Sequence, residues 1–377
     1  MPTSRNVAAI SAPPEHLLGN SDTWPLRVTF DELRVRLPSA RLHPAADEQD
    51  VRGARFCQLH LAALFETEDA FADFTGARHH HAALYGLPLA LPDRIGPICD
   101  MLQLMFVVDD ILDSATMEKR SAANFRADMA ALLKGFSLEG DGPARRVAQA
   151  MSHVIGELLA TGMSQRHVDC LLADMAAHAE SCLRENTSKL HDEINDIDSY
   201  RRTHASVGGV PVVLRLLEYS LGVDIGAEQQ ESTLLRDISQ VVNWHMMHVN
   251  SLFSFRKEMF EENNATNLVL VLARRQGMSV QAAADAVCDE IRATEAAYYR
   301  LRDEAFDHPF SDQEAVRRYL IGLDYLLSGT IAFHAVNPRY HGVAGLWLAE
   351  EPVAATMHIY PDRTVFTPAS RHASEGR

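Results

Sequence analysis

The spacing of the apolar residues constrains the fold of this chain more than any other feature. In the middle of the sequence they recur roughly every three to four residues over long stretches, which is the period of an amphipathic α-helix. Alternating runs rich in Val, Ile and Tyr, which would indicate strands, are scarce. We therefore expect an all-α protein with helices near residues 50–77, 93–114, 117–135, 143–161, 163–189, 192–222, 231–261, 264–275, 279–306 and 311–336.

The two ends of the 377-residue chain lack this period. Residues 1–25 are rich in Ser, Pro and Asn, and residues 343–377 carry a similar mixture. The length allows two or three domains, but an all-helical chain of this size can form a single one. We expect one helical domain over residues 26–342, between a flexible N-terminal extension and a C-terminal extension.

A break is predicted inside the helical stretch 192–222. The run Val207-Gly208-Gly209-Val210-Pro211 places two helix-weakening glycines before a proline that has no backbone N–H. Such a break can be a plain kink between two core helices, or it can free backbone groups for use in a site. The sequence leaves both interpretations open.

Charge and composition exclude several classes of protein. Lys and Arg total 35 against 51 Asp and Glu, and the resulting net charge of −16 argues against nucleic acid or an anionic membrane as a partner. The longest apolar runs, such as residues 268–273, are too short to span a membrane, and no signal peptide is evident. The five cysteines are scattered without a C-x-x-C pair, which predicts a reducing, cytoplasmic location.

An acidic cluster ends the predicted helix 93–114. Asp109, Asp110 and Asp113 follow Phe106 in the run FVVDDILD, and Asp109 and Asp113 share one helix face because they are four residues apart. Carboxylates this close repel one another unless a cation neutralises them, and oxygen ligands suit Mg²⁺ or Mn²⁺. The alternative is an acidic helix end exposed to water.

A second group of oxygen-bearing side chains lies on the predicted helix 231–261. Asn250, Ser254 and Glu258 recur at every fourth position and form one stripe. An amide, a hydroxyl and a carboxylate oxygen are all suitable Mg²⁺ ligands, and Mg²⁺ fills its other positions with water or phosphate oxygens. A polar surface face is the alternative, but apolar neighbours such as Trp244 and Phe253 favour an interior cleft.

These two motifs, in this order, resemble those of class I terpene cyclases of the microbial terpene synthase family. Asp109-Asp110-x-x-Asp113 is similar to the family's aspartate-rich motif. Asn250, Ser254 and Glu258, with Lys257, are similar to its NSE triad. Arg339-Tyr340, after the last predicted helix, resembles the family's C-terminal Arg-Tyr pair.

The resemblance implies a single class I terpenoid synthase-like helical bundle around a central apolar cavity. The cavity mouth is expected to hold three Mg²⁺ ions, or Mn²⁺, and the diphosphate of a linear isoprenoid. The expected metal ligands are Asp109, Asp110, Asp113, Asn250, Ser254 and Glu258. Lys257, Arg339 and Tyr340 would stabilise the departing diphosphate, with Asp109 as a further catalytic residue.

Departure of diphosphate leaves an allylic cation, which an apolar cavity with aromatic faces protects from water. Phe106, Phe333 and Trp244 are the expected lining residues, and the family often has a tryptophan where this chain has Phe333. The resemblance implies a carbon–oxygen lyase that cyclises farnesyl diphosphate to a cyclic sesquiterpene hydrocarbon or alcohol. A diterpene cyclase using geranylgeranyl diphosphate remains open, and a homodimer is usual in the family.

The chain departs from the family pattern at the diphosphate sensor. Members carry an arginine four residues before the glycine of the helix break, which is Gly208 here, but this chain has His204 at that position. Either His204, protonated beside an anion, replaces the arginine, or Arg201 or Arg202 reaches the site. The three histidines at 79–81 point in different directions on a helix, which predicts a polar loop or helix end rather than one metal site.

Two other functions are compatible with parts of this pattern. A chain-elongating prenyl diphosphate synthase needs a second aspartate-rich motif, but the second helix here carries Asn250, Ser254 and Glu258. A non-enzymatic helical scaffold would not need aligned oxygen ligands beside apolar residues on interior helices. Both are less consistent with the motifs than a terpene cyclase.

Overall fold

The computed structural model describes residues 24–29, 33, 36–113, 142–190, 197, 200–201, 209–226, 232–262, 266–342 and 355–368. Within these ranges, the side chains of residues 112–113, 183–190, 311–312 and 368 are left out of the description. The predicted helix 117–135, the predicted site residues Arg202, His204 and Gly208, and the side chain of Asp113 lie outside the described residues.

Helices dominate the described residues, which confirms the all-α prediction. The α-helices are α1 (Ala46–Phe56), α2 (Glu68–Gly76), α3 (His81–Gly86), α4 (Ile95–Asp113), α6 (Pro143–Ala160), α7 (Gln165–Leu190), α9 (Val210–Leu221), α11 (Thr233–Arg256), α12 (Leu268–Gln276), α13 (Val280–Asp307) and α14 (Glu314–Val336). Short π-helical turns, η2 (Cys57–Leu61) and η4 (Lys257–Glu261), and 3-10 turns, η3 (Ala62–Leu64), η5 (Pro309–Asp312) and η6 (Pro338–Tyr340), extend or link them.

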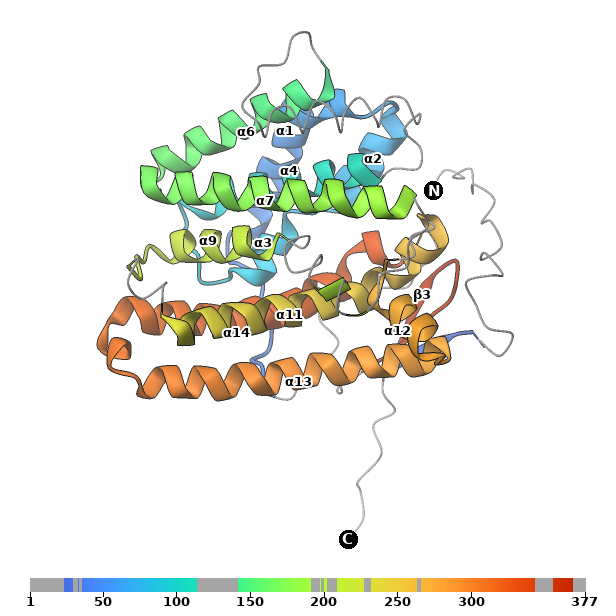
Figure 1. Ribbon diagram of the computed structural model, residues 1–377. Helices are drawn as coiled ribbons and strands as arrows, with labels where there is room; N and C mark the ends of the chain where they lie inside the picture. The colour runs from blue at the N-terminus through green and yellow to red at the C-terminus, as the bar shows by residue number, and fades with distance from the viewer. Residues whose placement is uncertain are drawn as a thin grey trace.

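The helices are stacked in layers (Figure 1). Helices α11, α13 and α14 lie along one side of the bundle, α6 and α7 lie along the other, and α3 and α9 lie between them. Helix α4 packs against α3 and α6, and α11 packs against both α13 and α14. This arrangement leaves the inner faces of α4, α11 and α14 around a common interior space.

The predicted helix 50–77 is divided in two. The chain passes from α1 through the π-helical and 3-10 turns, and Phe65 then adopts an extended backbone. Thr67 starts α2 as its N-cap, because its Oγ1 accepts a hydrogen bond from the N–H of Ala70 at 3.1 Å. The apolar period continues across the division, so spacing alone could not reveal it.

The predicted break before Pro211 is confirmed. Gly209 precedes α9 with φ of +62°, in the left-handed region, and Pro211 occupies the first turn of the helix. A Cβ at Gly209 would come within 2.5 Å of the Cε atom of Met105 on α4. The backbone conformation therefore favours glycine here, and a larger residue would also have to displace the flexible end of Met105.

A small antiparallel sheet joins the two ends of the described chain. Its strands are β1 (Leu26–Thr29), β2 (Ala355–Ile359) and β3 (Thr364–Pro368), in the order β1-β2-β3. Leu26 pairs with Ile359, and Ala355 pairs with Pro368. Residues 343–377 are predicted to be an extension, but β2 and β3 form within this segment. Through β1, the sheet also packs against α13. Whether residue 342 is a domain boundary stays a prediction.

Helix α14 runs through the core. Its length and composition would suit a membrane span, but 83% of its most apolar stretch is buried inside the bundle, as expected for a core helix. Its closest neighbour is α3: a Cβ at Gly329 would lie 2.1 Å from the carbonyl oxygen of Tyr85. The two backbones therefore pack directly on each other at this glycine.

Candidate active site

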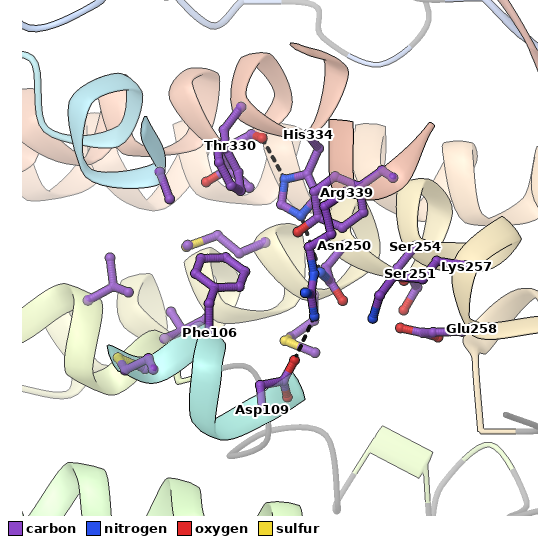
Figure 2. A pocket seen from close by; sticks show the side chains of 18 of the residues that line it. Phe106, Asp109, Asn250, Ser251, Ser254, Lys257, Glu258, Thr330, His334 and Arg339 are labelled. Atoms are coloured by element: carbon purple, nitrogen blue, oxygen red, sulfur yellow. Dashed lines mark hydrogen bonds and ion pairs between the residues drawn. The ribbon is translucent and has the colours of Figure 1, made fainter. Parts of the chain in front are cut away.

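A cavity of about 210 Å³ opens between α4, α11 and α14. Figure 2 shows side chains of all three helices directed into it. The residues predicted for the site that line this cavity are Phe106, Asp109, Asn250, Ser254, Lys257, Glu258, Phe333, Arg339 and Tyr340. The fold thus brings together, from segments far apart in the sequence, most of the predicted site residues that the structure describes.

A second, larger space of about 830 Å³ adjoins the first on the far side of Lys257 and Arg339. It contains Asp110, but it lacks the side chains of the α11 stripe. We locate the candidate site in the smaller cavity, because only that cavity is bordered both by Asp109 and by the stripe. Asp110 is linked to the smaller cavity by its ion pair with Arg339, which lines both cavities.

The inner part of the cavity is mainly apolar. Leu102, Met105, Val210, Val213 and Leu326 line it. The ring centroids of Phe106 and Phe333 are 5.9 Å apart at this end. Such aromatic faces attract positive charge while keeping water away.

Trp244 was predicted to line the cavity, but it does not belong to the lining. Its ring stacks on His248 of the same helix, with centroids 6.0 Å apart. At 3.6 residues per turn, Trp244 lies about 120° around α11 from Asn250. The helix geometry therefore directs the two side chains to different sides.

The acidic end of α4 is held by Arg339. The guanidinium of Arg339 donates a hydrogen bond from Nη1 to Asp110 and another from Nη2 to Oδ2 of Asp109, at 3.1 Å. Burial alone would lower the pKa of Arg339, but Asp110 and Asp109 raise it above its usual value. Burial likewise favours the neutral form of Asp110, yet Arg339 and then Lys257 outweigh it and lower the pKa of that carboxyl.

Lys257 is the second cation at the cavity mouth. Its Nζ pairs with Oε1 of Glu262. Burial, and then the charge of Arg339, would lower the pKa of Lys257, but Glu262, Asp110 and Asp109 more than compensate and raise it. Lys257 and Arg339 are therefore both held in their charged forms beside the carboxylates.

The α11 stripe presents its three oxygen-bearing side chains to the cavity. The hydroxyl oxygen of Ser254 is buried and has no hydrogen-bond partner within the described part of the chain. A helical serine can usually bond to the carbonyl four residues earlier, so a buried hydroxyl left open is costly unless a ligand uses it. Glu258 lies in the π-helical turn that follows α11, a feature common at functional sites that the regular spacing did not predict.

Two buried neutral side chains hold the outer members of the stripe. The amide Nδ2 of Asn267 donates to Oε2 of Glu258 at 2.8 Å and to the carbonyl of Ser251 at 2.8 Å. The Nε2 atom of His334, on α14, lies 3.2 Å from Nδ2 of Asn250 (Figure 2). Neither Asn267 nor His334 belongs to a motif recognised in the sequence.

The donor set fits a hard divalent metal. Asp109 faces the stripe across the cavity mouth, so carboxylate, amide and hydroxyl oxygens approach one place from two helices. The open hydroxyl of Ser254 provides a ligand atom that no protein group uses in the described structure. Asn250, Ser254, Glu258 and Asp109 are thus the described residues that could hold such an ion.

The predicted diphosphate sensors are only partly described. Arg201 lies 3.5 Å from Glu290 of α13, with about half of its side chain exposed, and it does not line the cavity. Its neighbour Tyr200 does line the cavity and is 2.8 Å from Ser251 through their hydroxyls. Tyr200 belongs to none of the motifs found in the sequence, so it was not predicted as a site residue.

The three consecutive histidines do not all face one point, as predicted, but two of them converge. Nε2 of His80 and Nε2 of His81 lie 2.8 and 2.7 Å from the same oxygen of Asp50. His79 is buried and stacks on Phe106, with centroids 4.5 Å apart. The run lies in a turn and at the start of α3, as predicted, although the side chains of His79 and His80 are buried.

The chain is similar to known proteins over most of its length. Residues 100–297 match the family model described as terpene synthase family 2, C-terminal metal binding. A (3S,6E)-nerolidol synthase of Selaginella moellendorffii is 25% identical over 272 residues, which are 71% of this chain and 72% of the relative. Sesquiterpene synthase 1 of Postia placenta is 23% identical over 288 residues, 75% of this chain and 82% of the relative.

Among solved structures, the linalool/nerolidol synthase of Streptomyces clavuligerus has a TM-score of 0.65 and 20% sequence identity to this chain. The match covers 79% of this chain and 98% of that structure. At this identity the likeness concerns the fold, which is the helical bundle described above.

Proposed function

Because this chain belongs to the terpene synthase family, we propose that it is a Mg²⁺-dependent cyclase of farnesyl diphosphate. One observation carries the proposal: the oxygen ligands of α4 and α11 and the cations Lys257 and Arg339 meet at the mouth of an aromatic, apolar cavity. This arrangement suits a substrate with a charged head and a hydrocarbon tail. We expect the head to bind beside the carboxylates and the tail to lie against the rings of Phe106 and Phe333.

The metal ligands would be Asp109, Asp110 and Asp113 at the end of α4 and Asn250, Ser254 and Glu258 on α11 and its π-helical turn. We expect three ions, as in the family. When bound, divalent cations neutralise the diphosphate oxygens and make diphosphate a better leaving group. The open hydroxyl of Ser254 and the acidic end of α4 support this assignment.

The protein's own cations complete the head-group site. Arg339 and Lys257 are charged and buried, and Tyr340 is buried with a hydroxyl whose pKa is raised by burial, so it stays a neutral donor. As the carbon–oxygen bond breaks, its electron pair leaves with the diphosphate. Arg339, Lys257 and Tyr340 donate hydrogen bonds to the oxygens that gain this charge.

The cavity then controls the allylic cation. Phe106 and Phe333 present ring faces to it, while Leu102, Met105 and Val213 exclude water. The chain folds against these walls, the cation is captured by a double bond of the same molecule, and loss of a proton or addition of water ends the reaction. The product would be a cyclic sesquiterpene hydrocarbon or alcohol, and the enzyme a carbon–oxygen lyase.

A fifteen-carbon substrate is supported by the relative named a sesquiterpene synthase. Cyclisation of geranylgeranyl diphosphate is the second reaction to test. Chain elongation is the third, because this chain has Asn250, Ser254 and Glu258 where a chain-elongating synthase has its second aspartate-rich motif. The cytoplasmic location and the homodimer stay predictions. The diphosphate sensor also stays open between Arg202 and His204, since Arg201 pairs with Glu290.

The test is incubation of the purified chain with Mg²⁺ and, separately, geranyl, farnesyl and geranylgeranyl diphosphate. Volatile products are identified by gas chromatography with mass spectrometry, and released diphosphate is assayed in parallel. Asp109→Asn and Glu258→Gln should fold and lose at least about 100-fold in turnover, because each weakens a metal ligand. Asp303→Asn, at an exposed pair with Arg36, is the matched control and should keep full activity.

A cyclic product from farnesyl diphosphate would support the proposal. A longer diphosphate, formed when isopentenyl diphosphate is added, would replace it with chain elongation. Full turnover by Asp109→Asn would remove the assignment of the metal site.

A further inference from the structure

Asn250 differs from the other ligands of the stripe because its side chain has two unlike ends. Only the Oδ1 atom can bind a metal ion, whereas the Nδ2 group carries two hydrogens and repels a cation. A half-turn of the amide exchanges the two atoms at almost no steric cost. Something must therefore fix the orientation of this amide if Asn250 is to be a good ligand.

The hydrogen bonds of His334 determine which atom of Asn250 faces it. Nδ1 of His334 lies 2.8 Å from the carbonyl oxygen of Thr330, one turn earlier in α14. A carbonyl oxygen can only accept, so Nδ1 carries the hydrogen, and Nε2 of the neutral ring has a free lone pair. That lone pair accepts from Nδ2 of Asn250 at 3.2 Å.

The environment keeps this arrangement in place. His334 is 7% exposed, and its ring lies against Tyr340, with centroids 4.6 Å apart, and against Phe253, at 5.8 Å. Asn250 meets the ring from α11 while Thr330 holds it from α14 (Figure 2). With Nδ2 bonded to the imidazole, Oδ1 is left for the cavity side, where Ser254 and Glu258 also lie.

We propose that His334 is a positioning residue that fixes the amide of Asn250 with its Oδ1 atom toward the metal site, and thereby sets the metal affinity of the α11 stripe. The proposal rests on the proposed function, because it assigns a task to a residue beside the proposed ligand Asn250, in the lining of the same cavity. In this role His334 acts on the amide of Asn250 and not as a metal ligand. Its effect passes entirely through the orientation of Asn250.

Two substitutions separate this role from plain packing. His334→Gln keeps a polar acceptor near the place of Nε2, where it can still meet Asn250. His334→Asn keeps an amide donor near the place of Nδ1, where it can still meet the Thr330 carbonyl, but it loses the contact to Asn250. Both variants are polar and of similar size, so each is expected to fold. Thermal unfolding checks this for both.

The readout is binding of Mn²⁺ in the presence of inorganic diphosphate, measured on the full chain by electron paramagnetic resonance. Loss of a partner that orients a metal ligand typically costs about 10- to 100-fold in affinity. We expect His334→Asn to raise the dissociation constant about 10-fold or more, and His334→Gln to stay within about threefold of the unsubstituted chain. The Mg²⁺ concentration needed for half-maximal turnover should shift in the same order.

A double-mutant cycle completes the test. In the Asn250→Ala background no amide remains to be oriented, so adding His334→Asn should cause no further loss of Mn²⁺ affinity. Equal affinity of His334→Asn and the unsubstituted chain, or an undiminished loss in the Asn250→Ala background, would overturn the proposal alone. Absence of Mn²⁺ binding and of turnover in the unsubstituted chain would overturn the proposed function as well.

Discussion

Arg256 donates a hydrogen bond from its Nε atom to the backbone carbonyl oxygen of Tyr340, at 3.2 Å. Arg256 is the last residue of α11 and only 2% exposed, and its NH1 atom lies 2.8 Å from Glu261. Arg256 lies between Ser254 and Lys257 in the sequence, whereas Tyr340 belongs to the Arg339-Tyr340 pair. One buried guanidinium therefore ties the α11 stripe to the segment that carries Arg339.

We expect Arg256→Lys to fold but to lose both stability and turnover. A lysine keeps the charge but cannot reach the Tyr340 carbonyl and Glu261 with one planar group. Loss of a hydrogen bond from a charged donor should lower the free energy of unfolding by about 2 kcal/mol. Urea unfolding and diphosphate release measure the two effects. Arg236→Lys, at an exposed position of the same helix, is the control, and equal stability of the two variants would contradict the prediction.

Phe106→Leu should change the product mixture more than the rate of diphosphate release. The ring of Phe106 lies between His79 and Phe333 and forms one wall of the cavity, with the Arg339 guanidinium 5.4 Å from its centroid. Leucine keeps an apolar wall but removes the ring face that stabilises a cation. Product ratios by gas chromatography, set against the diphosphate release rate, measure the difference. An unchanged product profile would remove Phe106 from the cation-binding wall.

His245 is expected to make the protein less stable in acid. It is fully buried on α11, neither ring nitrogen has a hydrogen-bond partner among the described residues, and burial followed by the nearby His248 lowers its pKa to about 3. Below a pH of about 6.5, His245 is protonated in the unfolded chain but stays neutral in the folded chain. The free energy of unfolding is therefore unaffected by this proton above pH 6.5. It falls by about 1.4 kcal/mol per pH unit as the pH drops from 6.5 toward 3.

His245→Leu should consequently raise the free energy of unfolding at pH 7 by about 1 kcal/mol, because it removes an unsatisfied buried polar group. It should also flatten the decline of stability between pH 6.5 and 4.5. Urea unfolding at several pH values measures both effects. Parallel pH profiles for the variant and the unsubstituted chain would show that His245 takes no part in the acid response.

Gly329→Ala should destabilise the bundle strongly. The added methyl group would overlap the carbonyl of Tyr85, a backbone atom that cannot move without shifting α3 against α14. We expect a loss of about 3 kcal/mol or more. Gly156→Ala is the matched control in α6, where nothing lies within 4 Å, and it should stabilise by about 0.5–1 kcal/mol. Thermal unfolding of both variants decides, and a neutral Gly329→Ala would show that the helices can separate there.

Long helices with strong periods were predictable from the sequence. The predicted range 143–161 became Pro143–Ala160, and 279–306 became Val280–Asp307, because apolar spacing and end signals agree there. The polar residues at the cavity mouth were also predictable from their position on the helices. Asp109, Asn250, Ser254 and Glu258 are polar residues within apolar helices, and such residues need a partner.

Other features depend on tertiary contacts that a helical period does not record. The strands 355–359 and 364–368 are short, and β2 finds its partner β1 at the opposite end of the chain. His334 belongs to no sequence motif, and its role depends on a contact between α11 and α14 that the sequence does not record. Trp244 does not line the cavity, because the helical repeat directs it to another side of α11 than Asn250, where it stacks on His248.

Because β2 and β3 lie after the last motif residue, a truncated gene could encode every motif and still lose the small sheet. The N–H of Thr364 donates to the carbonyl of His341 at 3.0 Å, directly after the Arg339-Tyr340 pair, so the β2–β3 hairpin fastens the segment that carries both. A stop codon placed just after the codon for Gly342 would leave every motif residue encoded. It would nevertheless release that segment and uncover the pairing edge of β1, inviting aggregation. An intact set of motifs in a shortened reading frame would therefore not indicate a working enzyme.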